Sequence, residues 1–186
     1  ITYPITLPMC APLSDGAAAA ILCTEEGLKR IGADKSRCIK ISASVLRSFS
    51  PRRIDQPELH VGRLAAQQAY EIAGLGPQDM HVAEVHDASA MGEIIQAENL
   101  GLVELGMGGP AAERGDFTIG GRIPINPSGG LESKGHPIGA TGIGQLYELV
   151  TQLRGEAGAR QVEGARHAIQ ENGGGMQGVE EAAVAI

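Results

Sequence analysis

The hydrophobic and polar positions along the chain alternate between the spacing of strands and the spacing of helices. Leu64, Gln68 and Ile72 recur every four residues and predict a helix that begins near Leu59 and ends at Gly74. The alternation over 38–45 instead predicts a strand. By the same reasoning, we expect further strands over about 80–85, 166–170 and 179–186, and further helices over about 24–31, 89–100 and 138–153.

The order of these elements indicates an α/β fold, because strands and helices follow one another along the chain. This order favours a layered, mostly parallel sheet with crossover helices. Ligands of such sheets gather at the carboxyl ends of the strands. We also expect a buried strand or helix segment over the apolar run 17–23, an extended segment over 117–125, and a turn over 171–175.

Composition and charge narrow the function classes. The chain has 186 residues, of which 42% are hydrophobic and 27 are glycine, as in globular proteins rich in tight turns. A formal net charge of −7 argues against a nucleic-acid-binding surface. Cys10, Cys23 and Cys38 have no metal-binding spacing and are interpreted as reduced thiols of a cytoplasmic protein. No apolar run has the length of a membrane span, and no signal peptide is recognised.

The most informative segment is the glycine-rich loop Asn126–Gly142, which holds five glycines, two prolines and His136 in front of a predicted helix. Such a loop brings backbone close to a bound molecule and fixes one imidazole at a helix N-terminus. The loop resembles the signature loop of the thiolases, in particular of their lipid-transfer-protein-like branch. Its Gly135-His136-Pro137 centre carries the resemblance.

Other segments strengthen the resemblance. Val85-His86-Asp87-Ala88-Ser89 is similar to the His-Asp-Cys-Phe motif of that branch, and Glu171–Met176 is similar to its terminal Cys-x-Gly-Gly-Gly-Met segment. Cys10–Ala20 resembles the segment that closes a thiolase N-terminal domain. The resemblance therefore implies a thiolase fold, with the tail of the N-terminal domain over 1–35 and the C-terminal domain over 36–186. The chain is expected to be a fragment or a processed chain, because it lacks an initiator Met.

The resemblance also implies roles for particular residues. His136 would activate a nucleophilic cysteine that lies outside this chain, and His86 would orient a water or the thioester oxygen in the same oxyanion hole. The backbone N–H of Gly173 would contribute to a second oxyanion hole. Other residues expected to line the substrate are Asp87, Ser89, Gly135 and Pro137. The substrate would be a coenzyme A thioester undergoing thiolysis or Claisen condensation, with no metal ion and no covalently bound cofactor.

The resemblance further implies partners. Family members form homodimers or dimers of dimers, and some pair with a small zinc-ribbon/OB-fold subunit of the DUF35 type. The missing N-terminal thiolase half would be required as well, so we expect this chain alone to be inactive.

The sequence departs from the family at the second acid/base. Thiolases usually place a cysteine there, but the matching positions in this chain hold Glu171 and Ala88. Glu171 could act as the base, because burial can raise a carboxyl pKa toward neutrality, or it could simply bond backbone N–H groups. Ser89 stands in place of the family's Phe and suggests a wider or more polar acyl pocket. Two alternatives stay open: a CoA-dependent retro-aldolase on the same fold, and an acyl-CoA- or lipid-binding protein without catalysis.

The remaining candidates have simpler interpretations. His60, His81 and His167 are interpreted as surface or structurally satisfied histidines. Three arginines, Arg47, Arg52 and Arg53, fall in an irregular stretch and indicate a solvated loop. The alternative for the arginines is that one of them binds a carboxylate on a dicarboxylic acyl chain.

Overall fold

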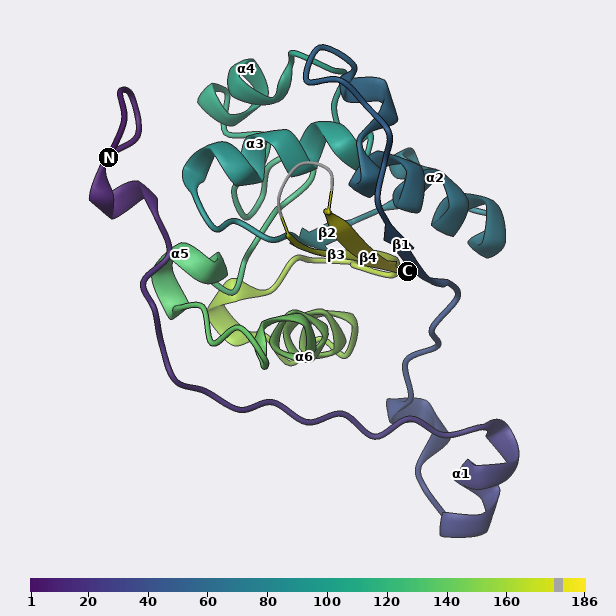
Figure 1. Ribbon diagram of the computed structural model, residues 1–186. Helices are drawn as coiled ribbons and strands as arrows, with labels where there is room; N and C mark the ends of the chain where they lie inside the picture. Colours follow the sequence, from purple (N-terminus) through teal and green to yellow (C-terminus); the bar gives the residue numbers. More distant parts are fainter. Residues whose placement is uncertain (176–178) are drawn as a thin grey trace.

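The chain forms a four-stranded sheet with helices on both faces (Figure 1). This computed structural model describes residues 1–175 and 179–186. The strands are β1 (Ser44–Ser48), β2 (Val82–Glu84), β3 (Ala168–Gly174) and β4 (Glu181–Ala185). The helices are α1 (Glu25–Ile31), α2 (Val61–Ala73), α3 (Ala90–Asn99), α4 (Gly108–Glu113), α5 (Gly130–Lys134) and α6 (Thr141–Leu153). None of the helices described is both long enough and apolar enough to cross a bilayer.

The sheet has the order β1-β4-β3-β2. The α/β class with crossover helices is confirmed, and the described strands β1, β2 and β3 run in the same direction, with β4 opposed to them. β2 and β3 run parallel, whereas β4 is antiparallel to both β3 and β1. The reason is the short connection over 175–180, since a parallel pair needs a crossover of a dozen or more residues. The parallel pair is the part of the sheet that matters for the site below.

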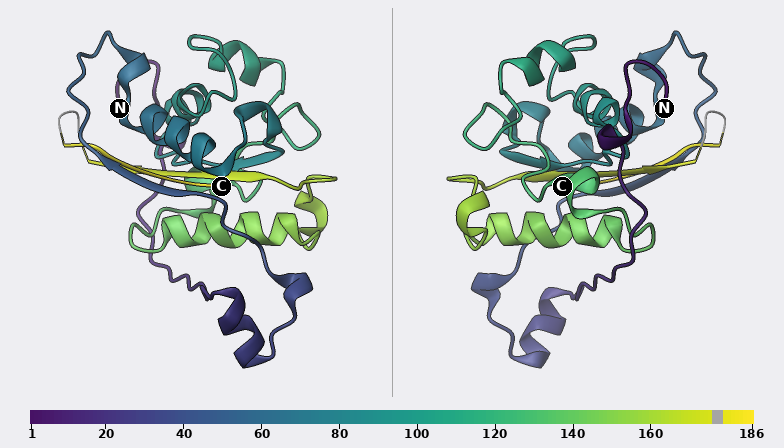
Figure 2. Two further views of the ribbon diagram at one scale, coloured as in Figure 1. Left: turned by 90° about the vertical axis from the view of Figure 1, so that its right-hand side faces the viewer. Right: turned by 90° about the vertical axis from the view of Figure 1, so that its left-hand side faces the viewer.

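The helices form one layer on each side of the sheet. α2 and α3 cover one face, and α6 covers the other (Figure 2). The predicted helix over 59–73 is confirmed as α2, and Gly74 ends it in the left-handed conformation with φ 68°. The helix that was expected to start at Ile138 instead starts at Thr141. This difference keeps the preceding loop free to approach β2.

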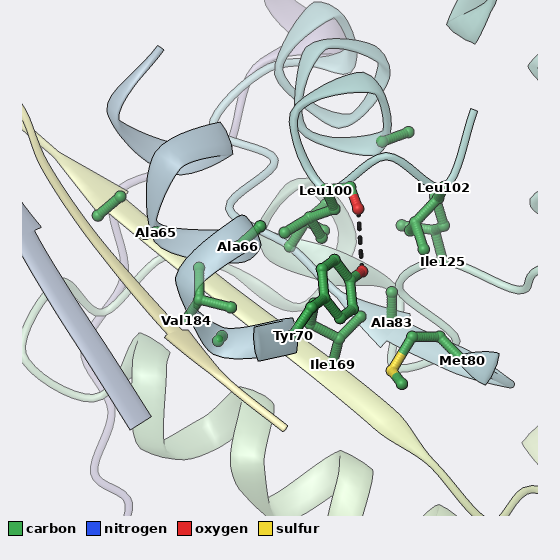
Figure 3. Close-up of a cluster of buried hydrophobic side chains, with 14 of the residues drawn as sticks. Ala65, Ala66, Tyr70, Met80, Ala83, Leu100, Leu102, Ile125, Ile169 and Val184 are labelled. Atoms are coloured by element: carbon green, nitrogen blue, oxygen red, sulfur yellow. Dashed lines mark hydrogen bonds between the residues drawn. The ribbon is translucent and has the colours of Figure 1, made fainter. Parts of the chain in front are cut away.

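The core between α2 and the sheet is built from small residues (Figure 3). Ala65 and Ala69 are fully buried on the face of α2 that packs against β1 and β4. Their small side chains allow a close approach of helix to sheet. Tyr70 supplies most of the volume beside them, and its buried hydroxyl donates to Leu100 O at 2.9 Å. The low aromatic content is therefore compensated by close backbone packing.

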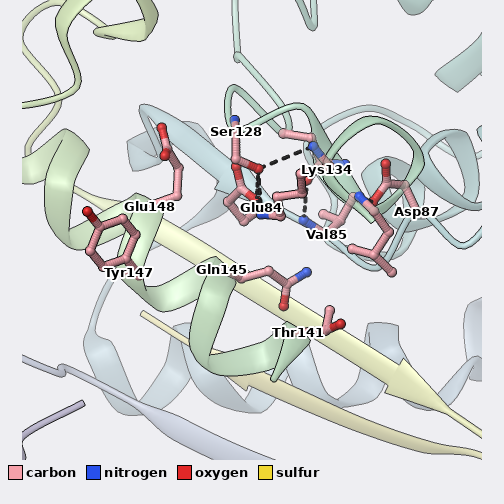
Figure 4. Close-up of polar contacts among 12 residues, drawn as sticks. Glu84, Val85, Asp87, Ser128, Lys134, Thr141, Gln145, Tyr147 and Glu148 are labelled. Carbon is pink, nitrogen blue, oxygen red and sulfur yellow. Dashed lines mark hydrogen bonds and ion pairs between the residues drawn. The ribbon is translucent and has the colours of Figure 1, made fainter. Parts of the chain in front are cut away.

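The opposite face of the sheet is held by polar contacts. Gln145 on α6 is fully buried and donates from Nε2 to Glu171 O at 3.0 Å. In turn, Gln170 donates from Nε2 to Gln145 Oε1 at 2.8 Å. Figure 4 shows Gln145 on α6 directed toward the sheet. These bonds fix α6 against β3, so the start of α6 lies near the catalytic candidates on β3.

Two local expectations near the N-terminal part are wrong. The run 17–23 is extended and exposed, with Ile21 90% and Leu22 75% accessible, because it lies on an arm that leaves the body of the domain (Figure 1). Cys23 and Cys38 are exposed as well. The strand expected over 38–45 begins only at Ser44. Backbone bonds to Ile186 continue the pairing back to Ala43 and Ser42, and no described strand pairs with residues 38–41.

Two expectations nearer the C-terminus also change. The turn expected over 171–175 is strand through Gly174, since Glu171 pairs with Val184 and Gly174 with Glu181. Met176, the last residue of the predicted motif, lies outside the described residues. The segment 117–125 is mostly turns, and only Ile125 forms a bridge, to Ala83 of β2.

Candidate active site

The parallel pair β2–β3 brings two sequence-distant groups together. His86 follows β2, and Glu171 lies on β3. The backbone N–H of His86 donates to Glu171 Oε2 at 3.1 Å. The His86 ring is held by the next residue of β3, because its Nδ1 lies 2.8 Å from Asn172 Oδ1. With the amide oxygen as acceptor, Nδ1 carries the proton and Nε2 keeps a free lone pair.

His136 meets His86 edge to face. The ring centroids are 4.8 Å apart, with an interplanar angle of 82°. The backbone of His136 is anchored to the N-terminal arm, since its N–H donates to Pro12 O at 3.3 Å and to Ser14 Oγ at 3.1 Å. The two predicted histidines therefore converge, although fifty positions separate them in the sequence.

The tautomer of His136 follows from its partner on α6. Thr141 Oγ1 donates its single proton to Pro137 O at 3.1 Å, and it lies 2.8 Å from His136 Nδ1. The hydroxyl must accept from the ring, so Nδ1 is protonated and Nε2 is the basic nitrogen. Burial, and then the neighbouring His86, lower the pKa of His136 below its usual value. The imidazole is thus set to accept a proton near neutral pH.

Among the candidate site residues, Glu171 has the carboxyl group whose pKa is raised the most. Its side chain is completely buried, and burial raises its pKa to about 8. The Oε1 atom takes no hydrogen bond from the residues that the structure describes. Gly173 accommodates this carboxyl, because a Cβ at that position would lie 2.9 Å from Oε1. A buried carboxyl with one unoccupied oxygen and a pKa near 8 can both take and give a proton.

A cavity of about 260 Å³ opens onto these groups. Its wall combines His86 and Glu171 with the glycines of β3 and with residues from α2, α3 and β4. The lining residues are Arg52, His60, Val61, His86, Gln96, Glu171, Gly173, Gly174, Gly175, Glu180, Glu181 and Ala182. His136 does not line the cavity, but its ring contacts the ring of His86, which does.

Other predicted site residues shape the loop and do not line the cavity. Asp87 is buried, and its carboxylate accepts from Leu131 N at 2.7 Å and Glu132 N at 3.4 Å at the start of α5. Burial raises the pKa of Asp87. A Cβ at Gly130 would overlap this carboxylate. Asp87 thus positions the glycine-rich loop.

Ser89, Gly135 and Pro137 likewise have structural contacts. Ser89 caps α3 by accepting from Gly92 N at 3.3 Å. Gly135 adopts φ 97°, and a Cβ there would overlap Ser14. Pro137 provides the carbonyl that orients Thr141. These residues set the position of His136 and of α3.

Several residues that hold the site were given no role by the sequence analysis. Asn172 and Thr141 orient the two histidines, as described above. Glu84 on β2 is fully buried, accepts from Ser128 N and Oγ, and pairs with Lys134 at 3.4 Å (Figure 4). Glu93 accepts from Asn126 Nδ2 at 3.1 Å, and burial raises its pKa to about 7. In the sequence, these residues could have been found from their positions within or next to the recognised motifs.

The comparisons with known proteins agree with this architecture. The profile of the family described as Thiolase C-terminal domain-like matches residues 49–186. The chain belongs to this family.

Two relatives illustrate the range of the family. This thiolase C-terminal domain is 46% identical over 174 residues to a sterol carrier protein 2 of Oryctolagus cuniculus, covering 90% of this chain and 32% of the relative. It is also 46% identical over 179 residues to an acetyl-CoA acetyltransferase of Methanothermobacter thermautotrophicus, covering 96% of this chain and 46% of the relative. The chain thus spans less than half the length of these relatives.

A solved structure supports the fold. The thiolase C-terminal domain superposes on a chain titled Ltp2-ChsH2(DUF35) aldolase with a TM-score of 0.62. The match covers 78% of this chain and 38% of the other, at 23% identity. At this identity the likeness concerns the fold alone.

The arginines and the other histidines of the thiolase C-terminal domain divide into two groups. Arg53 is exposed in a loop and bonds Asp55, as expected. Arg47 is also exposed and bonds Gln68, but the loop expected there is wrong, because Arg47 lies on β1 and pairs with Ala182. Arg52 differs, because it pairs with Glu180 at 3.1 Å and both side chains are largely buried.

His81 and His167 pair with each other, as the structural interpretation expected, with ring centroids 5.7 Å apart. Within residues 1–175 and 179–186, no three His, Cys, Asp or Glu side chains are grouped to hold a metal ion.

Proposed function

We propose that this thiolase C-terminal domain supplies the acid/base half of an acyl-CoA acyltransferase. The observation that carries the proposal is the convergence of two groups on His86: the His136 ring meets its ring edge to face, and Glu171, whose Oε1 has no partner among the described residues, accepts from its backbone N–H. A passive binding protein needs no such convergence.

The tautomers suggest how the histidines divide the work. His136 Nε2 takes the proton of a nucleophilic thiol that lies outside this chain, and the thiolate attacks the thioester carbonyl. The imidazolium formed then donates its Nε2–H to the carbonyl oxygen as negative charge develops there. The Nε2 atom of His86 accepts from a water, whose other proton can be directed to the same oxygen. Asn172 and Thr141 keep both rings in the tautomers that this requires.

Glu171 would provide the second acid/base. Its carboxylate removes the α-proton of an acyl-CoA, and the electron pair of the C–H bond becomes the enolate that attacks the acyl group. A pKa near 8 makes this transfer effective close to physiological pH. The backbone N–H of Gly173 is proposed to stabilise the enolate oxygen. In the thiolysis direction, the protonated carboxyl returns the proton to the α-carbon.

A retro-aldolase is the second candidate. It is favoured by Glu171 and Ala88 at the positions where thiolases carry a second cysteine. A buried carboxylate can take the proton of a β-hydroxyl as the Cα–Cβ bond breaks. The β-carbon then leaves as a carbonyl product, and the electron pair of the bond forms a thioester enolate that takes the proton back at Cα, without an acyl-cysteine. The fold likeness to a chain titled as an aldolase is compatible with this reading but does not discriminate.

The intact mass of the complete protein separates these functions. After incubation with a 3-oxoacyl-CoA and no free CoA, an acyltransferase gains one acyl group and loses it when CoA is added. For the retro-aldolase, a 3-hydroxyacyl-CoA yields a shorter CoA ester and a carbonyl product, with no adduct from either substrate. Binding without adduct or product would contradict both enzymatic functions and leave acyl-CoA binding.

The assembly is proposed from the family. We infer that the complete protein forms a homodimer or a dimer of dimers, and that a small DUF35-type subunit joins it. The structural neighbour, an Ltp2-ChsH2(DUF35) aldolase, has a DUF35 component in its name. Light-scattering mass of the purified protein, alone and with its co-purifying subunits, tests both points.

A further inference from the structure

Two residues that line the cavity, His60 and Gln96, form a hydrogen-bonded chain with the buried Asn99. Asn99 is 3% exposed, and its Nδ2 donates to Gln96 Oε1 at 3.0 Å and lies 3.1 Å from His60 Nδ1. His60 Nδ1 also accepts from Gly62 N at 3.1 Å. Both contacts require an unprotonated Nδ1, so the neutral His60 ring carries its proton on Nε2. Burial lowers the pKa of His60 and favours this neutral form.

This chain fixes the orientation of the Gln96 amide. Because Oε1 faces Asn99, the Nε2 group faces the cavity. It lies 3.9 Å from the position that a Cβ of Gly173 would occupy, directly above the floor formed by β3. No residue of the described parts of the chain accepts a hydrogen bond from it. The Gln96 side chain is only partly exposed, so its Nε2 group is a donor held at the cavity and available to a ligand.

Two further donors lie on the same wall. Arg52 has a buried Nε–H with no partner among residues 1–175 and 179–186. His60 also lines the cavity and offers its Nε2–H. The described lining therefore includes three side chains with N–H donors, Gln96, His60 and Arg52, and two apolar ones, Val61 and Ala182.

The charge of the wall decides which acceptor fits. The Arg52 guanidinium is compensated by Glu180, which it contacts at 3.1 Å with both side chains largely buried. Glu181 adds a further negative charge at the cavity. A donor-rich wall without net positive charge suits a neutral oxygen better than a second carboxylate.

We propose that Gln96 is a substrate-binding residue, positioned by Asn99 and His60, that selects a short acyl group carrying a neutral carbonyl or hydroxyl oxygen along its chain. The inference rests on the proposed acyl-CoA function of the site. It names a substrate class that differs from long unsubstituted fatty acyl groups, for which a cavity of about 260 Å³ with a polar wall is poorly suited.

The test is calorimetric binding of three six-carbon thioesters to the complete protein: hexanoyl-CoA, 5-oxohexanoyl-CoA and adipyl-CoA. They share a six-carbon acyl chain and differ toward its distal end. This end is unsubstituted in hexanoyl-CoA, carries a neutral ketone in 5-oxohexanoyl-CoA and carries a carboxylate in adipyl-CoA. We expect the ketone to bind roughly 3- to 10-fold tighter than hexanoyl-CoA, as one neutral hydrogen bond provides. We expect adipyl-CoA to bind no tighter than hexanoyl-CoA.

Variants assign the preference to Gln96. Gln96→Met keeps the length of the side chain but removes the N–H donor. Because Gln96 is the main donor to the ketone, the preference for 5-oxohexanoyl-CoA over hexanoyl-CoA should fall to less than about twofold. Gln96→Glu is the second variant if the first lowers the unfolding midpoint. The matched control is Gln67→Met, an exposed glutamine on α2, which should keep the full preference. Asn99→Leu tests positioning, because Asn99 does not line the cavity and bonds Gln96 Oε1; it should weaken the ketone preference and leave the affinity for hexanoyl-CoA unchanged.

Each contrary result has a distinct meaning. Equal binding of all three thioesters, or an unchanged preference in both Gln96 variants, overturns the selectivity. Tightest binding of adipyl-CoA overturns the neutral-oxygen assignment. If none of the three binds, the proposed acyl-CoA function fails together with this inference.

Discussion

The carboxyl of Glu171 accepts a hydrogen bond from the backbone N–H of His86, with 3.1 Å between Oε2 and N. This bond joins the ends of two parallel strands and leaves only one oxygen of Glu171 available to a ligand. It also ties the acid/base candidate to the backbone of the histidine it would assist. The effects of substitutions at these two residues should therefore be coupled.

The first prediction concerns Glu171→Gln. The amide keeps the shape of the side chain but cannot accept a proton, so α-proton exchange of an acyl-CoA should fall about 10²- to 10⁴-fold. Deuterium uptake from heavy water, followed by mass spectrometry, measures this. Unchanged exchange would remove Glu171 from the mechanism, while the exposed change Glu58→Gln should have no effect.

The second prediction concerns stability and pH. Burial raises the pKa of Glu171 from its ordinary 4.5 to about 8, so the folded state holds this proton more tightly than the unfolded state. Its contribution is fully present below pH 4.5 and is lost as pH rises toward and through 8. The free energy of unfolding should fall by roughly 4 kcal/mol over this window from this group alone. Denaturant titrations of the wild type and of Glu171→Gln measure the difference, and equal slopes would contradict the assignment.

Two glycines on α6 provide the third prediction. A Cβ at Gly142 would lie 2.9 Å from Asn172 Nδ2, whereas a Cβ at Gly144 meets nothing within 4 Å. Gly142→Ala should displace Asn172, loosen the His86 ring and lower kcat about 10-fold. Gly144→Ala should leave kcat unchanged and raise stability by about 0.5–1 kcal/mol, as expected for a helix. Steady-state kinetics decide the point: equal effects of the two changes would contradict it.

The fourth prediction tests the orientation of His136. Thr141→Val removes the oxygen that accepts from Nδ1, so the ring loses its fixed tautomer and kcat should fall about 10-fold. Thr151→Val is the control on the same helix, since Thr151 makes an exposed bond of the same type to Tyr147 O. Nitrogen chemical shifts of His136 report the tautomer, and a ring that keeps its proton on Nδ1 in Thr141→Val would refute the assignment.

The fifth prediction compares two ion pairs. Arg52 and Glu180 are largely buried, so Arg52→Met leaves the Glu180 carboxylate without this cation and should cost roughly 3 kcal/mol of stability. Arg53 and Asp55 form an exposed pair, and Arg53→Met should cost less than about 1 kcal/mol. Chemical denaturation of both variants tests this. A loss of similar size in each would show that burial is not the cause.

Much of the secondary structure could be predicted from local signals. The helix over 59–73 follows from its spacing and from Gly74, and helix α1 begins where Thr24 accepts from Gly27 N at 3.1 Å. The strand ends were less certain, because a strand extends only where a neighbour pairs with it. This is why the expected turn over 171–175 became part of β3, and why the strand near Cys38 begins at Ser44.

The sequence by itself determined the α/β class, the glycine-rich loop and the presence of His86, His136 and Glu171, because these depend on local pattern and residue identity. Only the tertiary structure decided how they act together. The edge contact of the two rings, the complete burial of Glu171 and the donors on the Gln96 wall all arise where α2, α3, α6 and β3 pack together. Burial and distance between residues far apart in the chain set tautomer and pKa, and neither quantity is encoded at a single position.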